Sequence, residues 1–214
     1  MRLKLLIIIL LPFIIYSQDY KSFQGKLVYS IQIQDTALQK LFKPKTMTVY
    51  TNDTIVRIEN YSDQLGQQVV IKHLAYNKSI LLLEAKNNFY AIQTDLNIQD
   101  SSASKLTNKV IYKRKLGKRK VAGLKANRLQ LTNSKTKHTM EILYLKNYSP
   151  KYLDAYNDIP GLPVKYSITT EDGTFLYTLI SMENATLNRD LFGVPSNYKR
   201  VSFSQFLKEV VGSN

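Results

Sequence analysis

The chain has 214 residues, a formal net charge of +14 and no cysteine. This length is enough for one well-formed core, and the missing cysteine excludes a disulfide scaffold, a thiolate metal site, a cysteine nucleophile and a lipid-modified cysteine. The stability of the fold must therefore come from buried Ile, Leu, Val, Tyr and Phe side chains.

The first residues have the pattern of an export signal. Arg2 and Lys4 form a positive start, residues 5–15 are apolar, and Ser17 precedes a cleavage point. The apolar stretch is too short to span a bilayer, and no second run of membrane length follows. We therefore expect residues 1–17 to be removed and residues 18–214 to fold as a single exported domain, in the periplasm, at the outer membrane or outside the cell.

The next elements are a strand and a short helix. Residues 25–34 alternate between polar and apolar side chains, and the apolar ones are Leu27, Tyr29, Ile31 and Ile33. This period of two is typical of a half-buried strand. Residues 36–42 change to a helical period that starts with a capping box and stops at Pro44, which predicts a short helix.

Ten further strand patterns follow at short intervals, at residues 46–50, 54–59, 67–73, 79–84, 89–94, 110–115, 126–132, 139–145, 164–170 and 175–182. Turn-forming pairs such as Asn52-Asp53 separate them, so neighbouring strands are expected to form hairpins. Residues 96–108 are polar and without a period, which predicts a long loop. At residues 202–211 an apolar helical stripe begins with Ser202 and Gln205 spaced as a capping box, which predicts a second helix.

About eleven strands with a short helix near each end predict a mainly β fold. The expected architecture is a single curved antiparallel sheet that closes incompletely into a half-barrel, because a sheet of this width cannot stay flat. Incomplete filling of such a sheet leaves an apolar cavity. We expect its ligand-facing side chains to include Leu27, Tyr29, Ile31, Ile33, Tyr144 and Tyr166.

Positive charge is concentrated in one segment. Removal of Arg2 and Lys4 lowers the formal charge from +14 to +12, and the stretch between Ser101 and Met140 holds twelve Lys or Arg and no Asp or Glu. The expected contact surface for an anionic partner is its densest part, Lys113, Arg114, Lys115, Lys118, Arg119 and Lys120. Outside the cytoplasm the partners are anionic lipid or acidic protein rather than nucleic acid. An alternative of equal weight is that these cations keep an edge strand from pairing with other chains.

Patterns for catalysis or metal binding are missing from the sequence. His73 and His138 are the only histidines, and the chain has no His-Glu-x-x-His, no Gly-x-Ser-x-Gly and no phosphate-binding loop. We therefore predict no enzyme activity, no metal site and no cofactor.

Three blocks of the sequence have a recognisable pattern, namely Phe23–Tyr29, Lys120–Ala126, and Ile159–Tyr166 followed by Asp190–Tyr198. Together they resemble exported bacterial envelope proteins of the GLPGLI type, whose sheet is similar to that of the LolA and LolB lipoprotein carriers. Leu162 is followed by Pro163 rather than glycine, and Ala126 stands where relatives often carry cysteine, which removes a redox role. The resemblance implies an incomplete barrel with an apolar interior suited to acyl chains.

Two functions fit these patterns. In the first, the protein is a non-catalytic binding module that holds a lipid or a lipoprotein acyl chain, while residues 109–125 meet an anionic membrane surface or an acidic envelope protein. In the second, it is a structural or assembly component of the envelope with a filled core and no small-molecule ligand. The two differ in whether the cavity-facing side chains leave open space.

Overall fold

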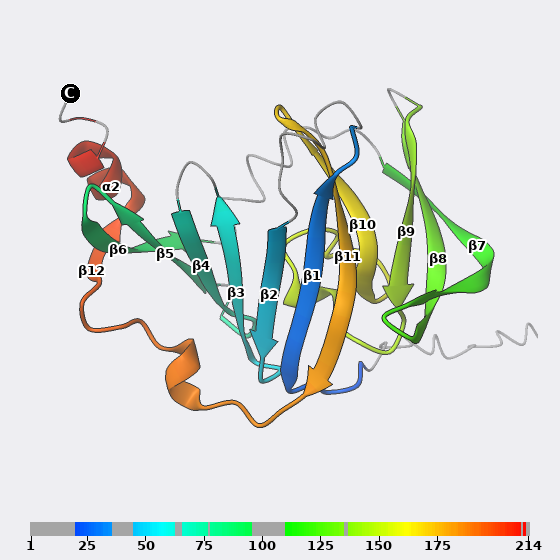
Figure 1. Ribbon diagram of the computed structural model, residues 1–214, viewed down its shortest axis with the longest axis horizontal. Coiled ribbons are helices and arrows are strands. Elements are labelled where there is room, and N and C mark those ends of the chain that lie inside the picture. The colour runs from blue at the N-terminus through cyan, green and yellow to red at the C-terminus, as the bar shows by residue number, and fades with distance from the viewer. Residues whose placement is uncertain are drawn as a thin grey trace, which may run out of the picture.

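A computed structural model describes residues 20–35, 45–62, 66–76, 78–95, 110–134, 137–210 and 212. The expected export signal, the helix expected at residues 36–42 and the polar stretch at residues 96–108 lie outside this part of the chain. The described part is mainly β, and its strands form one large curved sheet that does not close (Figure 1). A mainly β fold on a curved, open sheet is therefore confirmed.

The strands follow the chain as β1 Gly25–Ile33, β2 Lys45–Thr51, β3 Ile55–Ser62, β4 Gly66–His73, β5 Lys78–Ala85, β6 Asn88–Asp95, β7 Val110–Val121, β8 Leu124–Asn133, β9 Thr139–Leu145, β10 Leu162–Thr170, β11 Gly173–Asn184 and β12 Lys199–Ser202. Their order across the sheet is β12-β6-β5-β4-β3-β2-β1-β11-β10-β9-β8-β7. The eleven predicted strands are β1 to β11. One correction is needed, because β12 was not predicted and pairs parallel with β6, so the sheet is mixed rather than purely antiparallel.

The turn between β2 and β3 shows how the sequence specifies a hairpin. The Asn52 side-chain oxygen accepts hydrogen bonds from the backbone N–H groups of Thr54, at 3.2 Å, and Ile55, at 2.8 Å. Asp53 has a left-handed backbone with a φ of 74°. Asn and Asp tolerate such angles and bond their own backbone, so this pair reverses the chain with little cost.

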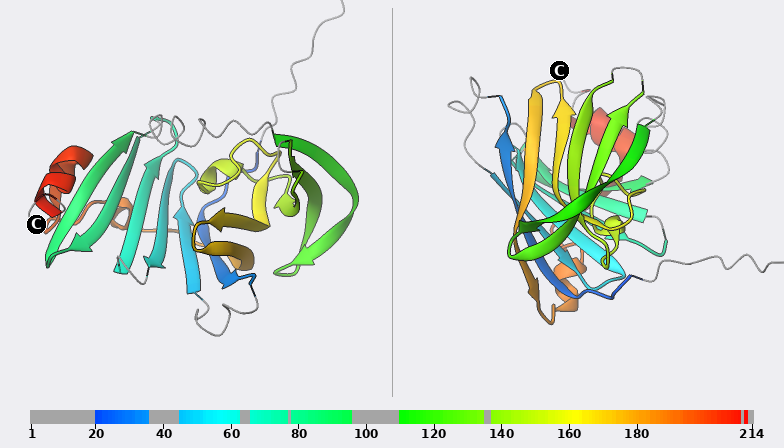
Figure 2. Two further views of the ribbon diagram at one scale, coloured as in Figure 1. Left: turned by 90° about the horizontal axis from the view of Figure 1, so that it is seen from above. Right: turned by 90° about the vertical axis from the view of Figure 1, so that its right-hand side faces the viewer.

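Two connecting segments cover opposite faces of the sheet (Figure 2). Residues 146–161, here called the inner segment, contain the 3-10 helix η1 (Pro150–Tyr152) and place buried Tyr152 against the main core. Residues 185–198, here called the outer segment, contain the 3-10 helix η2 (Arg189–Phe192) and pack Tyr198 near Ile71 and Leu82. Because alternate side chains of a strand point to opposite faces, the two segments bury different side chains of the same sheet.

The main core lies between the inner segment and strands β1, β2, β3, β8, β9, β10 and β11. Lys72 of β4 is also buried there, and its ammonium group donates to Asp154 at 2.7 Å and to the Lys151 carbonyl at 3.3 Å. Tyr152 donates a hydrogen bond to the carboxylate of Asp53. These polar contacts attach the inner segment to β4 and to the β2–β3 turn.

The C-terminal helix α2 (Phe203–Val210) begins as the sequence predicts. The Gln205 backbone N–H donates to the Ser202 hydroxyl at 3.2 Å, and the Ser202 N–H donates to the Gln205 side chain at 2.9 Å, which is a reciprocal capping box. Phe206 packs edge-on against Tyr90 of β6, with ring centroids 5.3 Å apart. Among the described residues, no helix has the length and apolar character needed to cross a bilayer.

Candidate functional site

The strongest charged feature is a strand at one end of the described sheet (Figures 1 and 2). β7 extends beyond its predicted end at Lys115 as far as Val121, and every residue of it except Val121 is exposed. It carries all six cations predicted to contact an anionic partner, here called the basic cluster: Lys113, Arg114, Lys115, Lys118, Arg119 and Lys120. The structure therefore brings these side chains together on one edge strand.

A bulge divides the basic cluster into two parts. Lys115 lies opposite Arg128 and Lys118 opposite Asn127, so Leu116 and Gly117 have no partner positions on β8. The φ of Gly117 is +80°, which glycine adopts without steric cost. Arg128 donates a hydrogen bond to the Leu116 carbonyl at 3.1 Å, and the Leu116 side chain is 94% exposed among the cations.

The cations of β7 point to both faces of the sheet. The register places Arg114 opposite buried Leu129 on the face of the inner segment, and Lys113 opposite Gln130 on the other face. Tyr112, two residues before Arg114, lies on the same face, and its hydroxyl donates a hydrogen bond to Asp158 of the inner segment at 2.7 Å. A partner that approaches the free edge of the strand can therefore meet cations from both faces.

No member of the basic cluster makes an ion pair with a described residue. Carboxylates pair with other cations instead, as Arg57–Glu59, Lys72–Asp154, Arg128–Glu141 and Lys199–Glu209. Neighbouring like charges repel one another, so the cluster does not stabilise the fold by internal pairing. Its charge remains available to a partner.

The six side chains predicted to line an apolar cavity are all buried, with exposed fractions of 8% or less. Five of them, Leu27, Tyr29, Ile31, Tyr144 and Tyr166, belong to the main core cluster. Tyr29 also donates a hydrogen bond to the Pro163 carbonyl at 2.8 Å. These side chains and the buried Ile33 therefore act mainly as packed core.

Tyr166 is the member of this set that borders open space. It lines a hollow of about 310 Å³ on the inner face together with Met47, Ile58, Val70, Leu153, Ile168 and Tyr177. Its ring stacks on Tyr177, with centroids 5.0 Å apart and an interplanar angle of 4°. Burial raises the pKa of Tyr166 well above its ordinary value, so the phenol stays neutral in this apolar setting.

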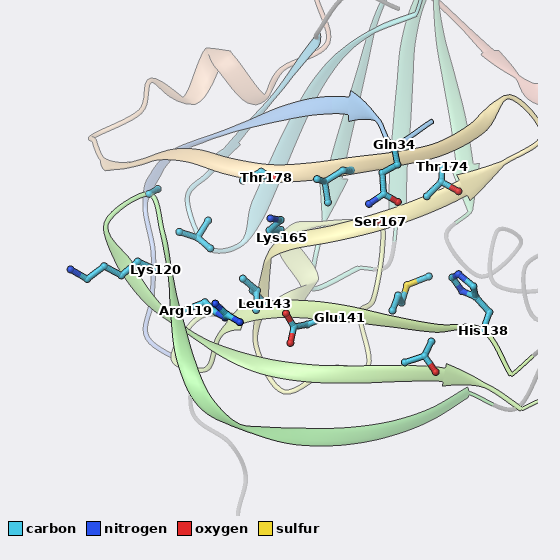
Figure 3. A pocket seen from close by; sticks show the side chains of 15 residues that line it. Gln34, Arg119, Lys120, His138, Glu141, Leu143, Lys165, Ser167, Thr174 and Thr178 are labelled. Carbon is cyan, nitrogen blue, oxygen red and sulfur yellow. The ribbon is translucent and has the colours of Figure 1, made fainter. Parts of the chain in front are cut away.

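A second and larger opening lies on the outer face, where β9 and β10 separate. The last paired positions are Leu143 and Lys165, and residues 139–142 and 166–170 lie outside this pairing. A cleft of about 730 Å³, here called the β9–β10 cleft, opens there (Figure 3). Its lining includes three cations, four hydroxyl groups and several apolar side chains, namely Arg119, Lys120 and Lys165; Thr139, Ser167, Thr174 and Thr178; and Val121, Leu143 and Leu176.

Pro163 provides a physical reason for this separation. A proline has no N–H group for the ladder, and Val164 falls at an irregularity in the register between Pro163 and Lys165. The gap is filled from the inner face by Tyr156, whose hydroxyl donates to the Ser167 carbonyl at 2.6 Å and lies 3.2 Å from the Met140 sulfur. Burial raises the pKa of Tyr156 to about 12, so the phenol keeps its donor proton well into the alkaline range.

The sequence predicted Arg119 and Lys120 as contact residues, but it did not predict Lys165 or the hydroxyl groups beside it. The signal for Lys165 was a single cation within an otherwise uncharged strand pattern, two residues after a proline. The cleft itself depends on where β9 and β10 stop pairing, which strand periodicity does not reveal.

Metal ligands do not gather in the described part of the chain. No group of three or more His, Cys, Asp or Glu side chains is close enough there to hold an ion. His73 ends β4 and packs near the ring of Tyr76, whereas His138 precedes β9 and lines one end of the β9–β10 cleft (Figure 3).

Comparison with known proteins found no protein-family model and no curated protein that matches this chain. The resemblance to the GLPGLI-type and LolA-like proteins therefore stays a prediction. The functional argument rests on the basic cluster, the inner hollow and the β9–β10 cleft.

Proposed function

We propose that the protein is an exported, non-catalytic binding module of the cell envelope that attaches to an anionic lipid surface through the basic cluster. The observation that carries this proposal is a row of six exposed cations on a terminal strand, none of them paired with a described carboxylate. A cation near an anionic bilayer contributes about 1 kcal/mol, so six give roughly 6 kcal/mol if additive. This corresponds to an affinity in the range of tens of micromolar, which suits reversible attachment.

The position of the cluster also supports attachment. β7 lies at the end of the described sheet and exposes cations to both of its faces, so a flat surface can be met edge-on without displacing other strands. The exposed Leu116 at the bulge adds one apolar side chain that can enter the head-group region. Protection of the edge against pairing with other chains operates together with this role.

The filled core favours a second candidate, a structural or assembly component that docks on an acidic envelope protein. The inner hollow of about 310 Å³ is at the lower end of the range for small-molecule sites, about 300–1,000 Å³. An acyl chain of a lipid or lipoprotein would be limited to a short segment beside Tyr166 and Tyr177.

Flotation of the protein with lipid vesicles tests the proposal. The variant Lys113→Gln/Arg114→Gln/Lys118→Gln/Arg119→Gln removes four charges from β7, and Lys21→Gln/Lys151→Gln/Arg189→Gln/Lys208→Gln removes four exposed charges elsewhere. We expect the wild type and the second variant to float with phosphatidylcholine vesicles that contain phosphatidylglycerol. The first variant, here called the β7 variant, should not bind these vesicles and should remain in the bottom fraction. None should float with phosphatidylcholine alone, and added salt should weaken binding because the charges are exposed.

Retained binding by the β7 variant would contradict the role of the basic cluster. If the wild-type protein does not bind vesicles that contain phosphatidylglycerol, the lipid proposal is overturned and docking on an acidic protein is favoured.

A further inference from the structure

The β9–β10 cleft carries an excess of positive charge that the edge strand alone does not explain. Arg119 and Lys120 come from the end of β7, but Lys165 comes from β10, which lies between β9 and β11 inside the sheet. Protection of a free edge accounts for cations on β7 and gives no reason for an exposed lysine on an interior strand.

The carboxylate in the cleft does not cancel this charge. Glu141 lines the cleft, but its Oε1 atom accepts from Arg128 Nε at 2.8 Å and lies 2.7 Å from Nη2 of the same guanidinium group. Arg128 therefore neutralises Glu141, and the three cleft cations keep their net charge.

The cationic and apolar parts of the cleft adjoin each other. Figure 3 shows Lys120 and Arg119 at one end, His138 at the other, and Leu143 and Lys165 between them. Buried Leu143 lies opposite Lys165 in the sheet register, so an apolar wall stands beside a central cation. The hydroxyl groups of Ser167, Thr174 and Thr178 belong to the same lining and can donate hydrogen bonds to an oxyanion.

We propose that the β9–β10 cleft binds an organic phosphate, a single phosphate group that carries an apolar substituent. A phosphate monoester bears up to two negative charges and presents several acceptor oxygens, which matches three cations and neighbouring hydroxyl donors better than a singly charged carboxylate does. The apolar substituent lies along Leu143, Val121 and Leu176. With a volume of about 730 Å³, the cleft is within the range of small-molecule sites.

Isothermal titration of the purified protein tests this site with four probes: octyl phosphate, octyl phosphocholine, octyl glucoside and inorganic phosphate. We expect octyl phosphate to bind at least tenfold more tightly than octyl phosphocholine and octyl glucoside, because the latter two lack the net negative charge. Tighter binding of octyl phosphate than of inorganic phosphate supports an organic phosphate whose substituent contacts the apolar wall. Equal binding of the two would overturn the apolar part of the proposal and assign the cleft to free phosphate.

Matched variants assign the binding to the cleft. Lys165→Gln removes a cleft cation without touching β7, and we expect it to weaken octyl phosphate binding about tenfold or more, the usual effect of losing one charge-assisted hydrogen bond. Lys113→Gln removes a cation of β7 that does not line the cleft, and its affinity should stay within about twofold of the wild type. Both positions are exposed, so thermal unfolding should confirm that the variants are folded.

The two proposals fail separately. A wild-type protein that binds neither octyl phosphate nor inorganic phosphate overturns the cleft site, and so does equal weakening by Lys165→Gln and Lys113→Gln, because that result reports only general charge attraction. Vesicle flotation by Lys165→Gln should remain like that of the wild type, which keeps failure of the cleft distinct from failure of the basic cluster.

Discussion

The two ends of the sheet differ in how far their strands are covered and in whether their cations form ion pairs. At the β3–β6 end, the outer segment and α2 cover the strands, and the buried or half-buried cations Lys72 and Arg57 are paired with carboxylates. At the β7 end, every residue of the strand except Val121 is exposed, and the basic cluster is paired with no described carboxylate. The ion pairs at the first end stabilise the fold, whereas the cations at the β7 end are available to bind a partner.

Truncating one apolar side chain at each end of the sheet tests this difference with the largest expected effect. Ile71→Ala leaves a cavity between the sheet and the outer segment, and we expect it to lower the free energy of unfolding by about 2–5 kcal/mol. Leu116→Ala, at the 94% exposed position on β7, should change it by less than about 0.5 kcal/mol. Urea titration measures both, and similar costs would mean that β7 is packed against something.

Alkaline pH should destabilise the protein through its buried tyrosines. Burial raises the pKa of Tyr29 and Tyr166, so above about pH 10 the unfolded chain loses protons that the folded chain keeps. Stability is full below that pH and should then fall by about 1.4 kcal/mol per pH unit for each group. Urea titrations at increasing pH measure the slope, which Tyr29→Phe should reduce, and an unchanged slope in that variant would contradict the prediction.

Asp154→Ala tests the contact that attaches the inner segment. It leaves the buried Lys72 ammonium with the Lys151 carbonyl as its remaining partner among the described residues. Because Asp154 is about half exposed, we expect a loss of about 1–3 kcal/mol. Lys72→Met/Asp154→Ala should recover much of that loss, since no buried charge remains. A double variant as unstable as the single one would assign the cost to Asp154 itself.

Neutralisation of Lys113 and Lys115 should have the smallest effect on the fold. Since these cations are exposed and repel their neighbours, Lys113→Gln/Lys115→Gln should change the free energy of unfolding by no more than about 0.5 kcal/mol. Thermal and urea unfolding measure this effect, and a larger loss would mean that the basic cluster has a structural role.

The sequence predicted the strands well because their buried faces follow a strict period of two, as β1 shows. It missed β12, a four-residue strand in which only Val201 is buried and which pairs with β6, far away in the chain. It ended β7 too early, because the bulge at Leu116 and Gly117 and a run of like charges interrupt the alternation that marks a strand.

The candidate sites were predictable to different degrees. The basic cluster could be predicted directly from the sequence, because cations that are close together in the chain remain close together in any fold. The six residues predicted to line an apolar cavity were chosen by strand alternation, which does not show whether side chains on a face fill it or leave space. That depends on the inner segment, whose Tyr152 and Leu153 pack in the main core. The β9–β10 cleft needs Lys165 and Arg119, which lie far apart in sequence and meet only through the curvature of the sheet.

Hydrogen–deuterium exchange in the presence of phosphatidylglycerol vesicles tests the central claim most directly, because it shows which end of the sheet meets the anionic surface. We predict slower exchange confined to β7 and the β7–β8 turn, with β3 to β6 and α2 unchanged, and no effect of phosphatidylcholine vesicles. Protection centred on β12 and α2, with β7 exchanging as it does in the free protein, would contradict the account.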